Sequence, residues 1–407
     1  MKAVVYHGVG DIRLDEVPEP KIKQPTDALV RLTASAICGT DLHFVRGTVS
    51  GMKSGTILGH EGVGIIEDVG KAVRNFRPGD RVVIPSSISC GNCSYCRAGY
   101  YAQCDTANPN GPQAGTAFFG GPEDAGAIQG LQAETARVPF ANVGLVKLPE
   151  EVSDDEAIAL SDIFPTGYFG AELAEIEPGR SVAVFGAGPV GQFAIASAKL
   201  FGAGRVFAID AIESRLDMAR DQGAEAINFD RDDPVEALRE LTGGIGVDRA
   251  IDAVGTDANA PTRGPGSNQS KAQKKQFAEE VKEIAPKAHP KGDNWHPGNA
   301  PSQALAWAVE TLAKAGTLSI IGVYDVTTRY FPIGKAVNKN LTMRMGNCHH
   351  RRYLPRLLDL VRTGAVDPLA ILTQAEPLTA ALDAYKAFDT RQPGWIKIKL
   401  EPTTVEV

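Results

Sequence analysis

The sequence predicts an α/β protein in which an irregular β-barrel is joined to a doubly wound parallel sheet. The first ~150 residues hold short β-rich segments separated by glycine and proline, and few convincing helices, which is typical of a compact barrel. From Ser181 the pattern changes, and apolar strand segments alternate with segments of helical periodicity, which indicates parallel strands joined by helices. The 407 residues, 43% of them hydrophobic and 22% charged, suffice for two domains with large cores.

The barrel segment is expected to contain strands at 1–6, 28–33 and 62–69. Because the first strand starts at once, and because every apolar run ends before the ~18 residues of a spanning helix, we expect no cleaved leader, no membrane partner and a cytoplasmic location. The net charge is −7 and the basic residues are scattered. This argues against a nucleic-acid partner, which would need a cationic face.

Four cysteines fall within one short stretch, Cys90-Gly-Asn-Cys93-Ser-Tyr-Cys96-Arg-Ala-Gly-Tyr-Tyr-Ala-Gln-Cys104. This spacing allows four thiolates to converge on one tetrahedral ion, and zinc suits such a closed four-sulfur cage. The sequence therefore predicts a structural zinc lobe over residues 90–104. The alternative is two disulfides, which the expected location and the total of six cysteines make less favourable.

The second part of the chain starts with two strands that alternate with two helices, at 182–185, 189–201, 206–209 and 214–222. Units of this length favour parallel strands with helices on both faces of the sheet. About six strands are expected in total. The others lie near 226–229, 249–254, 317–323 and 341–345. The last segments are expected to rejoin the barrel, with a helix near 353–362 and a strand at 395–400.

The turn Gly186-Ala-Gly188-Pro189-Val190-Gly191 lies directly between the first strand and the first helix of this second part. A G-x-G-x-x-G pattern is weak alone, but this context favours a dinucleotide site. Gly186 permits the tight turn, Gly188 lets the backbone approach a pyrophosphate, and Gly191 allows close packing of the helix, whose N-terminus favours the anion. The alternative is that the glycines serve only the turn.

Asp210 ends the second strand of this unit, 19 residues after Gly191. A carboxylate there can accept the ribose hydroxyls of the adenosine half, and it would repel a 2′-phosphate, so we expect NAD rather than NADP. Arg215, five residues further on, is expected to lie against the adenosine. The alternative is that Asp210 only caps the next helix.

The chain contains, in this order, Cys38-Gly-Thr-Asp, Gly59-His-Glu, the four-cysteine lobe and the glycine-rich turn. This series resembles the medium-chain zinc alcohol dehydrogenases over nearly the whole chain. The resemblance implies a GroES-like barrel as the catalytic domain, with a Rossmann-type NAD-binding domain inserted in it. We accordingly expect a catalytic domain at 1–160, an NAD-binding domain at 161–348 and a return to the catalytic domain at 349–407.

The resemblance also implies a catalytic zinc that is held by Cys38, His60 and Asp162, with a fourth position left for substrate. Asp162 stands where many alcohol dehydrogenases have cysteine. The stretch Ser161-Asp-Ile-Phe-Pro-Thr-Gly-Tyr168 looks more like the formaldehyde dehydrogenases that act without glutathione. Taken singly, the three residues have ordinary alternatives as a small core thiol, a buried imidazole and a helix cap.

In this family, an open zinc lowers the pKa of a bound alcohol, whose carbon can then release hydride to the nicotinamide. By resemblance, Thr40 accepts the alcohol proton and passes it toward His43, which exchanges it with solvent. Glu61, next to a ligand, tunes the metal. The alternative for His43 is a solvent-facing loop histidine. The expected cofactors are one catalytic zinc, one structural zinc and NAD.

Gly39 is one departure from the family pattern, because many alcohol dehydrogenases place a basic residue there on the cofactor pyrophosphate. We expect the glycine-rich turn, or residues such as His349 and Arg351, to supply the missing contact.

The segment 256–301 is a second departure, because it replaces a shorter connection and is rich in Pro, Gly, Lys and Asn. We expect it to cover NAD or the substrate as a lid, with an amphipathic helix at 271–284 and Trp295 as an apolar anchor. A subunit contact or plain disorder are the alternatives.

The sequence thus predicts an NAD-dependent zinc dehydrogenase that acts on a small or medium alcohol or aldehyde, as a homodimer or homotetramer. A polyol or threonine-type dehydrogenase of the same family would use the same apparatus with more polar pocket walls. A non-catalytic cofactor-binding protein is disfavoured because the predicted ligands and relay residues are all intact. Cys348 is expected to be a core or cleft residue without a function of its own.

Overall fold

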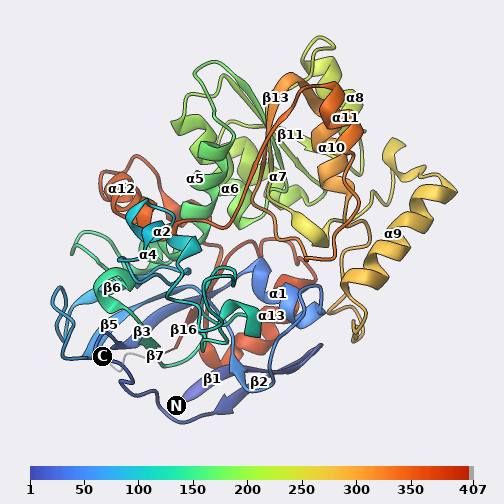
Figure 1. The fold of residues 1–407 in the computed structure, drawn as a ribbon. Helices are drawn as coiled ribbons and strands as arrows, with labels where there is room; N and C mark the ends of the chain where they lie inside the picture. The colour runs from blue at the N-terminus through green and yellow to red at the C-terminus, as the bar shows by residue number, and fades with distance from the viewer. Residues whose placement is uncertain (403–407) are drawn as a thin grey trace.

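A computed structural model describes residues 1–402, and Figure 1 shows a part rich in antiparallel strands below a second, helix-covered sheet. In the lower part, a three-stranded sheet has the order β2-β1-β4 and a larger sheet has the order β15-β16-β3-β5-β6-β8, with β7 paired to β3. The strands of the lower part are β1 (Lys2–Gly8), β2 (Asp11–Glu16), β3 (Ala28–Ile37), β4 (Thr56–Ile57), β5 (Gly62–Val69), β6 (Arg81–Ile84), β7 (Thr135–Val138), β8 (Val146–Lys147), β15 (Gln374–Pro377) and β16 (Ile398–Glu401).

The upper part is a parallel sheet of six strands in the order β11-β10-β9-β12-β13-β14. These strands are β9 (Ser181–Phe185), β10 (Arg205–Asp210), β11 (Glu225–Asn228), β12 (Val247–Asp252), β13 (Leu312–Ile320) and β14 (Thr342–Met345). The chain winds outward from β9 in one direction and then from β12 in the other, so the strand order reverses between β9 and β12. Ligands of doubly wound sheets bind outside the carboxyl ends of the strands at this point.

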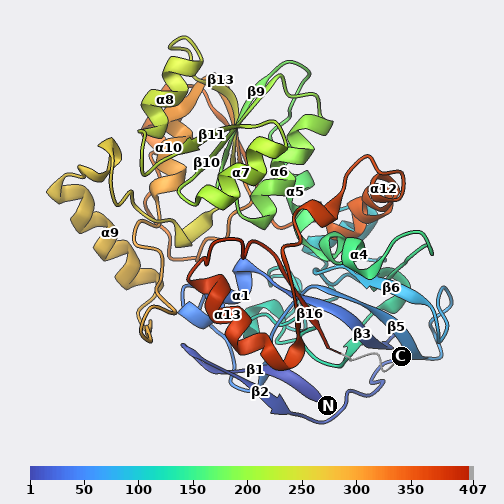
Figure 2. The same ribbon diagram turned by 180° about the vertical axis from the view of Figure 1, so that it is seen from behind.

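Helices cover both faces of the parallel sheet, because alternate residues of its strands point to opposite faces. On β9, Val182 and Val184 pack with helices α5, α6 and α7, whereas Ala183 and Phe185 pack with helices α8, α10 and α11. Figure 2 shows this layered arrangement from behind. The predicted combination of an irregular barrel and a doubly wound parallel sheet is confirmed.

The helices begin where the sequence supplies a start signal: Pro189 is the first residue of α6, and Ser153 and Glu156 form a capping box at α4. Within residues 1–402, none of the helices is both long and apolar enough to cross a membrane. They are α1 (Gly39–Arg46), α2 (Ser94–Arg97), α3 (Ala141–Gly144), α4 (Asp154–Ser161), α5 (Ile163–Leu173), α6 (Pro189–Leu200), α7 (Glu213–Asp221), α8 (Pro234–Leu241), α9 (Lys271–Ile284), α10 (Gln303–Thr311), α11 (Ile333–Asn338), α12 (His350–Arg362) and α13 (Ala381–Asp389).

The end of the chain returns to the barrel, as β16 pairs antiparallel with β3 and places Ile398 opposite Ile37. Helix α12 packs on α4 and α5 through Tyr353, Leu354 and Leu357, within the core that lies between the two parts of the molecule. The first and last segments of the chain therefore build one unit around the site described below.

The insertion between β12 and β13 contains α9, which has the predicted bounds and lies at the periphery of the molecule in both views (Figures 1 and 2). Trp295, further along the insertion, is 5% exposed and packs in an apolar cluster of the barrel with Phe44 and Tyr385. Its backbone N–H donates to Asp389 Oδ2 at 2.7 Å. The insertion thus starts at the parallel sheet and is attached to the barrel through Trp295.

Candidate active site

A cleft of about 410 Å³ lies between the barrel and the carboxyl ends of the parallel strands, within the usual size range of ligand sites. Its walls include Cys38, His60 and Asp162 from one side and Gly188 and Asp210 from the other. The fold therefore brings the predicted catalytic ligands and the predicted dinucleotide turn into a single cleft.

Each of the three ligand candidates lies where a regular element stops. Cys38 follows β3 and is the N-cap of α1, and its N–H donates to Asp41 Oδ2 at 2.9 Å. His60 lies between β4 and β5. Asp162 has non-helical dihedral angles between α4 and α5, and Pro165, in the first turn of α5, has no N–H to donate and favours a helix start there. Residues at such breaks can point into a cleft without disturbing a helix or a sheet.

The donor atoms of this set are close enough to share one ion. Asp162 Oδ2 lies 3.7 Å from Cys38 Sγ and 3.5 Å from His60 Nε2. Tetrahedral bonds of ~2.0 to 2.3 Å separate donor atoms by about 3.5 Å, so these distances suit zinc. With Glu61 included, one donor atom from each residue lies within 4.8 Å of the others, and all four residues are buried.

Charged groups behind the ligands hold them in place. Asp41 Oδ1 lies 3.4 Å from His60 Nδ1, on the side of the ring that faces away from Asp162. Glu61 Oε1 accepts a hydrogen bond from Lys397 Nζ at 2.6 Å, and both side chains are buried. Burial raises the pKa of Glu61, although Lys397 opposes this effect. The other oxygen of Glu61 has no hydrogen-bond partner among residues 1–402, so it is available near the metal ligands.

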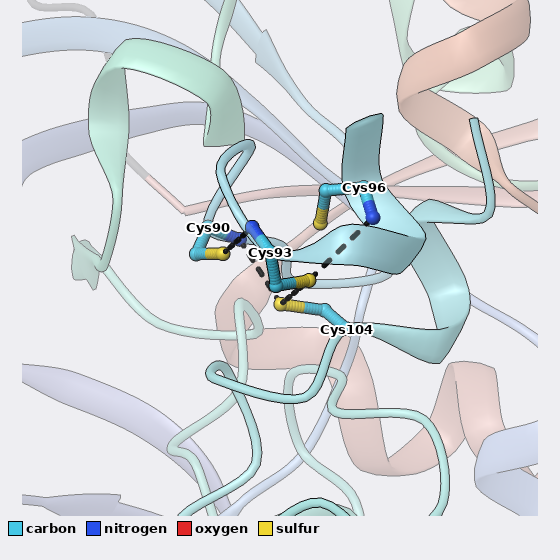
Figure 3. Close-up of side chains that lie close together, drawn as sticks. All are labelled: Cys90, Cys93, Cys96 and Cys104. Atoms are coloured by element: carbon cyan, nitrogen blue, oxygen red, sulfur yellow. Dashed lines mark hydrogen bonds between the residues drawn. The ribbon is translucent and has the colours of Figure 1, made fainter. Parts of the chain in front are cut away.

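The four-cysteine lobe has a different construction, since all its ligand candidates come from one loop (Figure 3). The Sγ atoms of Cys93 and Cys104 are 3.9 Å apart, which is too far for a disulfide, and all four thiols are free. Backbone N–H groups point at the sulfurs, as in the 3.3 Å bond from Cys90 N to Cys104 Sγ. Although burial acts to raise the pKa of the Cys90 thiol, backbone N–H bonds led by that of Asn92 lower it to about 6. This arrangement suits four thiolates around one ion, rather than the alternative of two disulfides.

The predicted proton-relay residues lie on α1 beside the metal ligands. Thr40 Oγ1 is 3.9 Å from Cys38 Sγ. His43 lines the cleft and is only 5% exposed, so the alternative of a solvent-facing loop histidine is wrong. Its Nδ1 lies 3.0 Å from Asp257 Oδ2 and 2.9 Å from Thr48 Oγ1. A carboxylate only accepts, which assigns the proton to Nδ1 and leaves Nε2 as the acceptor.

Asp257 was not among the predicted site residues, because it comes from the inserted segment far along the chain. Its Oδ2 also accepts from Arg46 Nη1 at 2.9 Å, and Arg46 Nε donates to Asp389 Oδ1 at 2.8 Å. Burial would raise the pKa of Asp257, but the charges of Arg46 and His43 outweigh it and hold that pKa far below its usual range. Arg46 and His43 therefore favour the ionised form of the Asp257 carboxyl.

The glycine-rich turn has the geometry of a dinucleotide site. Gly186 has φ of +87°, and a Cβ on Gly191 would lie 1.9 Å from the carbonyl oxygen of Gly186, so neither position accepts a larger residue without strain. Pro189 and Val190 open α6 and line the cleft. The turn leaves backbone N–H groups and a helix N-terminus facing the cleft, where an anion is favoured.

Asp210 lines the cleft at the end of β10 and is held by the backbone. Its Oδ2 accepts from Ala187 N at 2.9 Å, and its Oδ1 accepts from Ala211 N at 2.7 Å. Arg215 Nη1 lies 3.7 Å from Asp210 Oδ2, and a Cβ on Gly188 would lie 3.6 Å from the same nitrogen. Arg215 therefore lies over the glycine-rich turn as well as beside the carboxylate.

The expectation that His349 or Arg351 replaces the missing basic residue at Gly39 is wrong for this structure. Among residues 1–402, neither of them lines the cleft, and His349 Nδ1 instead accepts from Ala102 N in the cysteine lobe at 3.2 Å. Arg391 lines the cleft near Arg215. Burial and the charge of Arg215 lower the pKa of Arg391 to about 10. Arg391 is half-buried, and the nearby charges of Arg215 and Arg46 outweigh those of Asp210 and Asp257 in their effect on its pKa, which suits this part of the cleft to an anionic ligand.

Two neighbours of the ligand Asp162 were also missed or left without a role. His350 lines the cleft, and its Nε2 lies 2.7 Å from Asp162 Oδ1. Burial would raise the pKa of Asp162, but the hydrogen bond from His350 helps to hold it well below its usual range. Cys348 is buried and also lines the cleft, as predicted. The sequence does not indicate that His350, rather than His349, faces Asp162, because this depends on where the first turn of α12 begins.

The insertion contributes only its first residues to this site. Within the described chain, residues 257–259 line the cleft and residues 260–301 do not. Helix α9 is therefore no wall of the cleft in this structure, and its action as a lid stays a prediction.

Comparisons with known proteins agree with this description. The model of the alcohol dehydrogenase GroES-like domain matches residues 24–150, and that of the zinc-binding dehydrogenases matches residues 189–262. A zinc-type alcohol dehydrogenase-like protein of Bacillus subtilis is 36% identical over 406 residues, which cover 99% of this chain and 100% of that protein. The glutathione-independent formaldehyde dehydrogenase of Pseudomonas aeruginosa is 39% identical over 268 residues, which cover 63% of this chain and 66% of that protein.

Among solved structures, the alcohol dehydrogenase of Thermus sp. ATN1 is similar with a TM-score of 0.79 and 34% identity, and the match covers 98% of this chain and 99% of that one. Sequence and fold thus agree over nearly the full length of the chain. The chain belongs to the medium-chain zinc-type alcohol dehydrogenase family and is a zinc-dependent oxidoreductase.

Proposed function

We propose that this enzyme oxidises a small or medium alcohol, or the hydrate of an aldehyde, with NAD, and that it belongs to the branch of glutathione-independent formaldehyde dehydrogenases. The observation that supports the proposal is that one cleft is lined by Cys38, His60 and Asp162, which belong with Glu61 to a group that could hold a metal ion, and by a glycine-rich turn near the carboxylate of Asp210. Aspartate as the third ligand and the similarity to the Pseudomonas enzyme support the branch.

Zinc held by Cys38, His60 and Asp162 would act as a Lewis acid that lowers the pKa of the substrate hydroxyl, and NAD would accept the hydride. Asp41 Oδ1 lies 3.4 Å from His60 Nδ1, and its negative charge would favour the ring orientation in which Nε2 faces the other donors. Glu61, neutralised by Lys397, places a carboxylate oxygen near the ligands and tunes the charge of the site. The Cys90, Cys93, Cys96 and Cys104 cage would hold a second, structural zinc.

We propose that the substrate proton moves along residues of α1 (Gly39–Arg46). We assign Thr40, beside Cys38, as the first acceptor and His43 as the next. His43 can accept at Nε2 because its Nδ1–H is held by Asp257. The negative charge of Asp257 then stabilises the imidazolium that forms, in the way a buried carboxylate supports a basic histidine.

The cofactor would lie across the glycine-rich turn, with its pyrophosphate at the N-terminus of α6. Many members of the family have a basic residue at position 39 that contacts the cofactor pyrophosphate, and here that position is Gly39. We assign Arg215 and Arg391 to supply positive charge to the pyrophosphate instead, because both residues line the cleft and Arg215 lies over that turn. Asp210 would accept a ribose hydroxyl, and its negative charge favours NAD over NADP.

The cleft walls favour a small substrate with both apolar and polar groups. Phe118 and Val49 supply apolar surface, whereas Ser86 and Thr116 supply hydroxyls, and Thr116 accepts from Asn347 Nδ2 at 2.7 Å. The polar wall is the observation that favours the second candidate, a polyol or threonine-type dehydrogenase. The alternative of a non-catalytic cofactor-binding protein does not explain why the predicted metal ligands and the proposed relay residues are all present.

We propose further that the enzyme is a homo-oligomer, with β14 at the interface. β14 is an edge strand of the parallel sheet, and among residues 1–402 no strand pairs with its outer side. Exposed apolar side chains occur in β14 and in the segment that connects β13 to it. These are Met345 at 57%, Val337 at 64%, Ile333 at 60% and Val326 at 99%. An apolar edge of this kind is unfavourable in water unless another copy covers it.

The substrate class can be tested with NAD reduction by purified enzyme that contains two zinc ions per chain. We expect turnover with formaldehyde hydrate and short primary alcohols, and values of kcat/KM for sorbitol and threonine that are at least 10-fold lower. A preference for the polyol or for threonine would instead support the second candidate. Full zinc content without turnover of any compound would favour the non-catalytic alternative.

The two metal sites should respond differently to mutation. Asp162→Ala is expected to lose about one zinc per chain and nearly all turnover while the fold persists, because the open site loses one of three ligands. Cys93→Ala is expected to impair folding, because a closed structural cage contributes to folding directly. Zinc content by atomic absorption and thermal unfolding of each variant are the measurements. The reverse pattern would contradict both assignments.

The cofactor preference should depend on the charge of Asp210. Asp210→Asn removes the charge and keeps only one of the two oxygens that accept backbone N–H bonds, so the preference is expected to move toward NADP by about 2 kcal/mol, in the range of a charge-assisted hydrogen bond. The ratio of kcat/KM for NAD and NADP measures it. Asp217→Asn, on the exposed side of α7, is the control and should change nothing. A wild-type enzyme that already prefers NADP would contradict the role of Asp210.

The oligomer interface can be tested by light scattering coupled to gel filtration. Wild-type enzyme is expected to elute as a dimer or tetramer, and the double variant Val337→Lys with Met345→Lys as a smaller species, because two buried charges disfavour the interface. Ile245→Lys replaces an apolar residue that is 76% exposed elsewhere and should not change the mass. An unchanged mass of the double variant would exclude this edge as the interface.

A further inference from the structure

The two oxygens of Asp162 face different groups. Oδ2 points to the other metal ligands, 3.7 Å from Cys38 Sγ and 3.5 Å from His60 Nε2. Oδ1 is occupied by two hydrogen-bond donors, His350 Nε2 at 2.7 Å and Thr166 Oγ1 at 3.1 Å. One oxygen of the carboxylate is thus free for a metal ion, and the other is bound within the protein.

The hydrogen bonds around His350 fix its ring. Because an ionised carboxylate can only accept, Nε2 carries the proton that it donates to Asp162. Nδ1 lies 3.0 Å from Ser87 Oγ, and it can accept the hydroxyl proton of that serine. His350 is the first residue of α12, and the next turn of that helix is packed in the core through Tyr353 and Leu354. Both ring nitrogens and the backbone of His350 are therefore held in place.

We propose that His350 is a positioning residue that makes Asp162 bind zinc through one oxygen only. The inference rests on the proposed role of Asp162 as a ligand. A carboxylate that bound zinc with both oxygens would add a bond to the metal and occupy the space of the fourth position, which the substrate hydroxyl needs. By keeping Oδ1 in a hydrogen bond of 2.7 Å, His350 withholds that oxygen and leaves the position open.

His350 is not itself a member of the ligand set. The group of residues whose donor atoms all lie within 4.8 Å of one another contains Cys38, His60, Glu61 and Asp162, and does not include His350. The ring faces the oxygen of Asp162 that is turned away from Cys38 and His60. This geometry matches a carboxylate ligand that is oriented by a neighbouring donor, an arrangement whose loss typically costs 10- to 100-fold in metal affinity or activity.

The test uses the whole enzyme with Co²⁺ in place of zinc, because four-coordinate Co²⁺ absorbs visible light more strongly than five-coordinate Co²⁺. The spectrum of Asp162→Ala is subtracted, so that only the open site is seen. His350→Leu removes the donor at similar size, whereas His350→Gln keeps an N–H donor. His7→Leu is the control, because His7 Nε2 makes a similar contact of 2.6 Å with Asp15 Oδ2 outside the cleft.

In His350→Leu, we expect weaker visible bands from the open site, because Oδ1 is then free to bind as well. We also expect release of its zinc to a chelator that is about 10- to 100-fold faster, because the carboxylate is no longer held in one orientation. His350→Gln and His7→Leu should keep the spectrum and release rate of the wild type. Ser87→Ala removes only the hydroxyl that contacts Nδ1 of His350, so it should release zinc at a rate between those of the wild type and His350→Leu. This variant provides the test if His350→Leu does not fold. The zinc of the cysteine lobe should be retained in all of them.

An unchanged spectrum and release rate in both His350→Leu and Ser87→Ala would overturn the inference. Complete loss of the open-site metal in both His350→Leu and His350→Gln would overturn it too, because it would make His350 a ligand. If Asp162→Ala retains two zinc ions, the ligand assignment of the proposed function has failed, and this outcome is distinct from a failure of the role of His350.

Discussion

Compensation of buried charge at the junction of the barrel and the parallel sheet is the constraint on which this structure depends. The pairs that provide it join segments far apart in the chain. They are Asp162 with His350, 188 positions apart, Glu61 with Lys397, 336 apart, and Arg46 with Asp257 and Asp389, 211 and 343 apart. Removing one member of a buried pair leaves an uncompensated charge and costs several kcal/mol. The geometry of the metal ligands is therefore a property of the whole chain, and no short motif contains it.

The same constraint connects the insertion to the proposed chemistry. Asp257, near the start of the insertion, contacts both Arg46 and the proposed relay residue His43. Asp389 accepts from Arg46 and also from the backbone of Trp295, near the end of the insertion. Arg46 thus contacts Asp257 directly and is linked to Trp295 through Asp389, and a change in the position of residue 257 would alter the surroundings of His43. If this segment acts as a lid, its closure over the cleft would also affect Asp257 and therefore the proposed proton transfer through His43.

The features that could be predicted from the sequence are those that contiguous residues determine. The glycine-rich turn, the four-cysteine lobe, the six parallel strands and the bounds of α9 depend on local spacing and periodicity. The partners of the ligands could not be predicted, because Lys397 and His350 have no local pattern and reach the site only through β16 and α12. His43 illustrates the same limit, since its place on α1 was predictable but its burial against Asp257 depends on the inserted segment.

The two proposed metal sites differ in what they require of the fold. The cysteine lobe takes its four predicted ligands from one stretch of the chain, residues 90–104, and backbone N–H groups of that stretch point at the sulfurs of Cys90 and Cys104, so the cage depends mainly on local structure. The other site takes Cys38, His60 and Asp162 from three separate breaks in regular structure, and α12 contributes the ring that orients the third. Of the two groups, it is the second that lines the cleft shared with the glycine-rich turn. The proposed zinc chemistry would therefore take place where the barrel and the parallel sheet meet, which is also where the proposed hydride acceptor would lie.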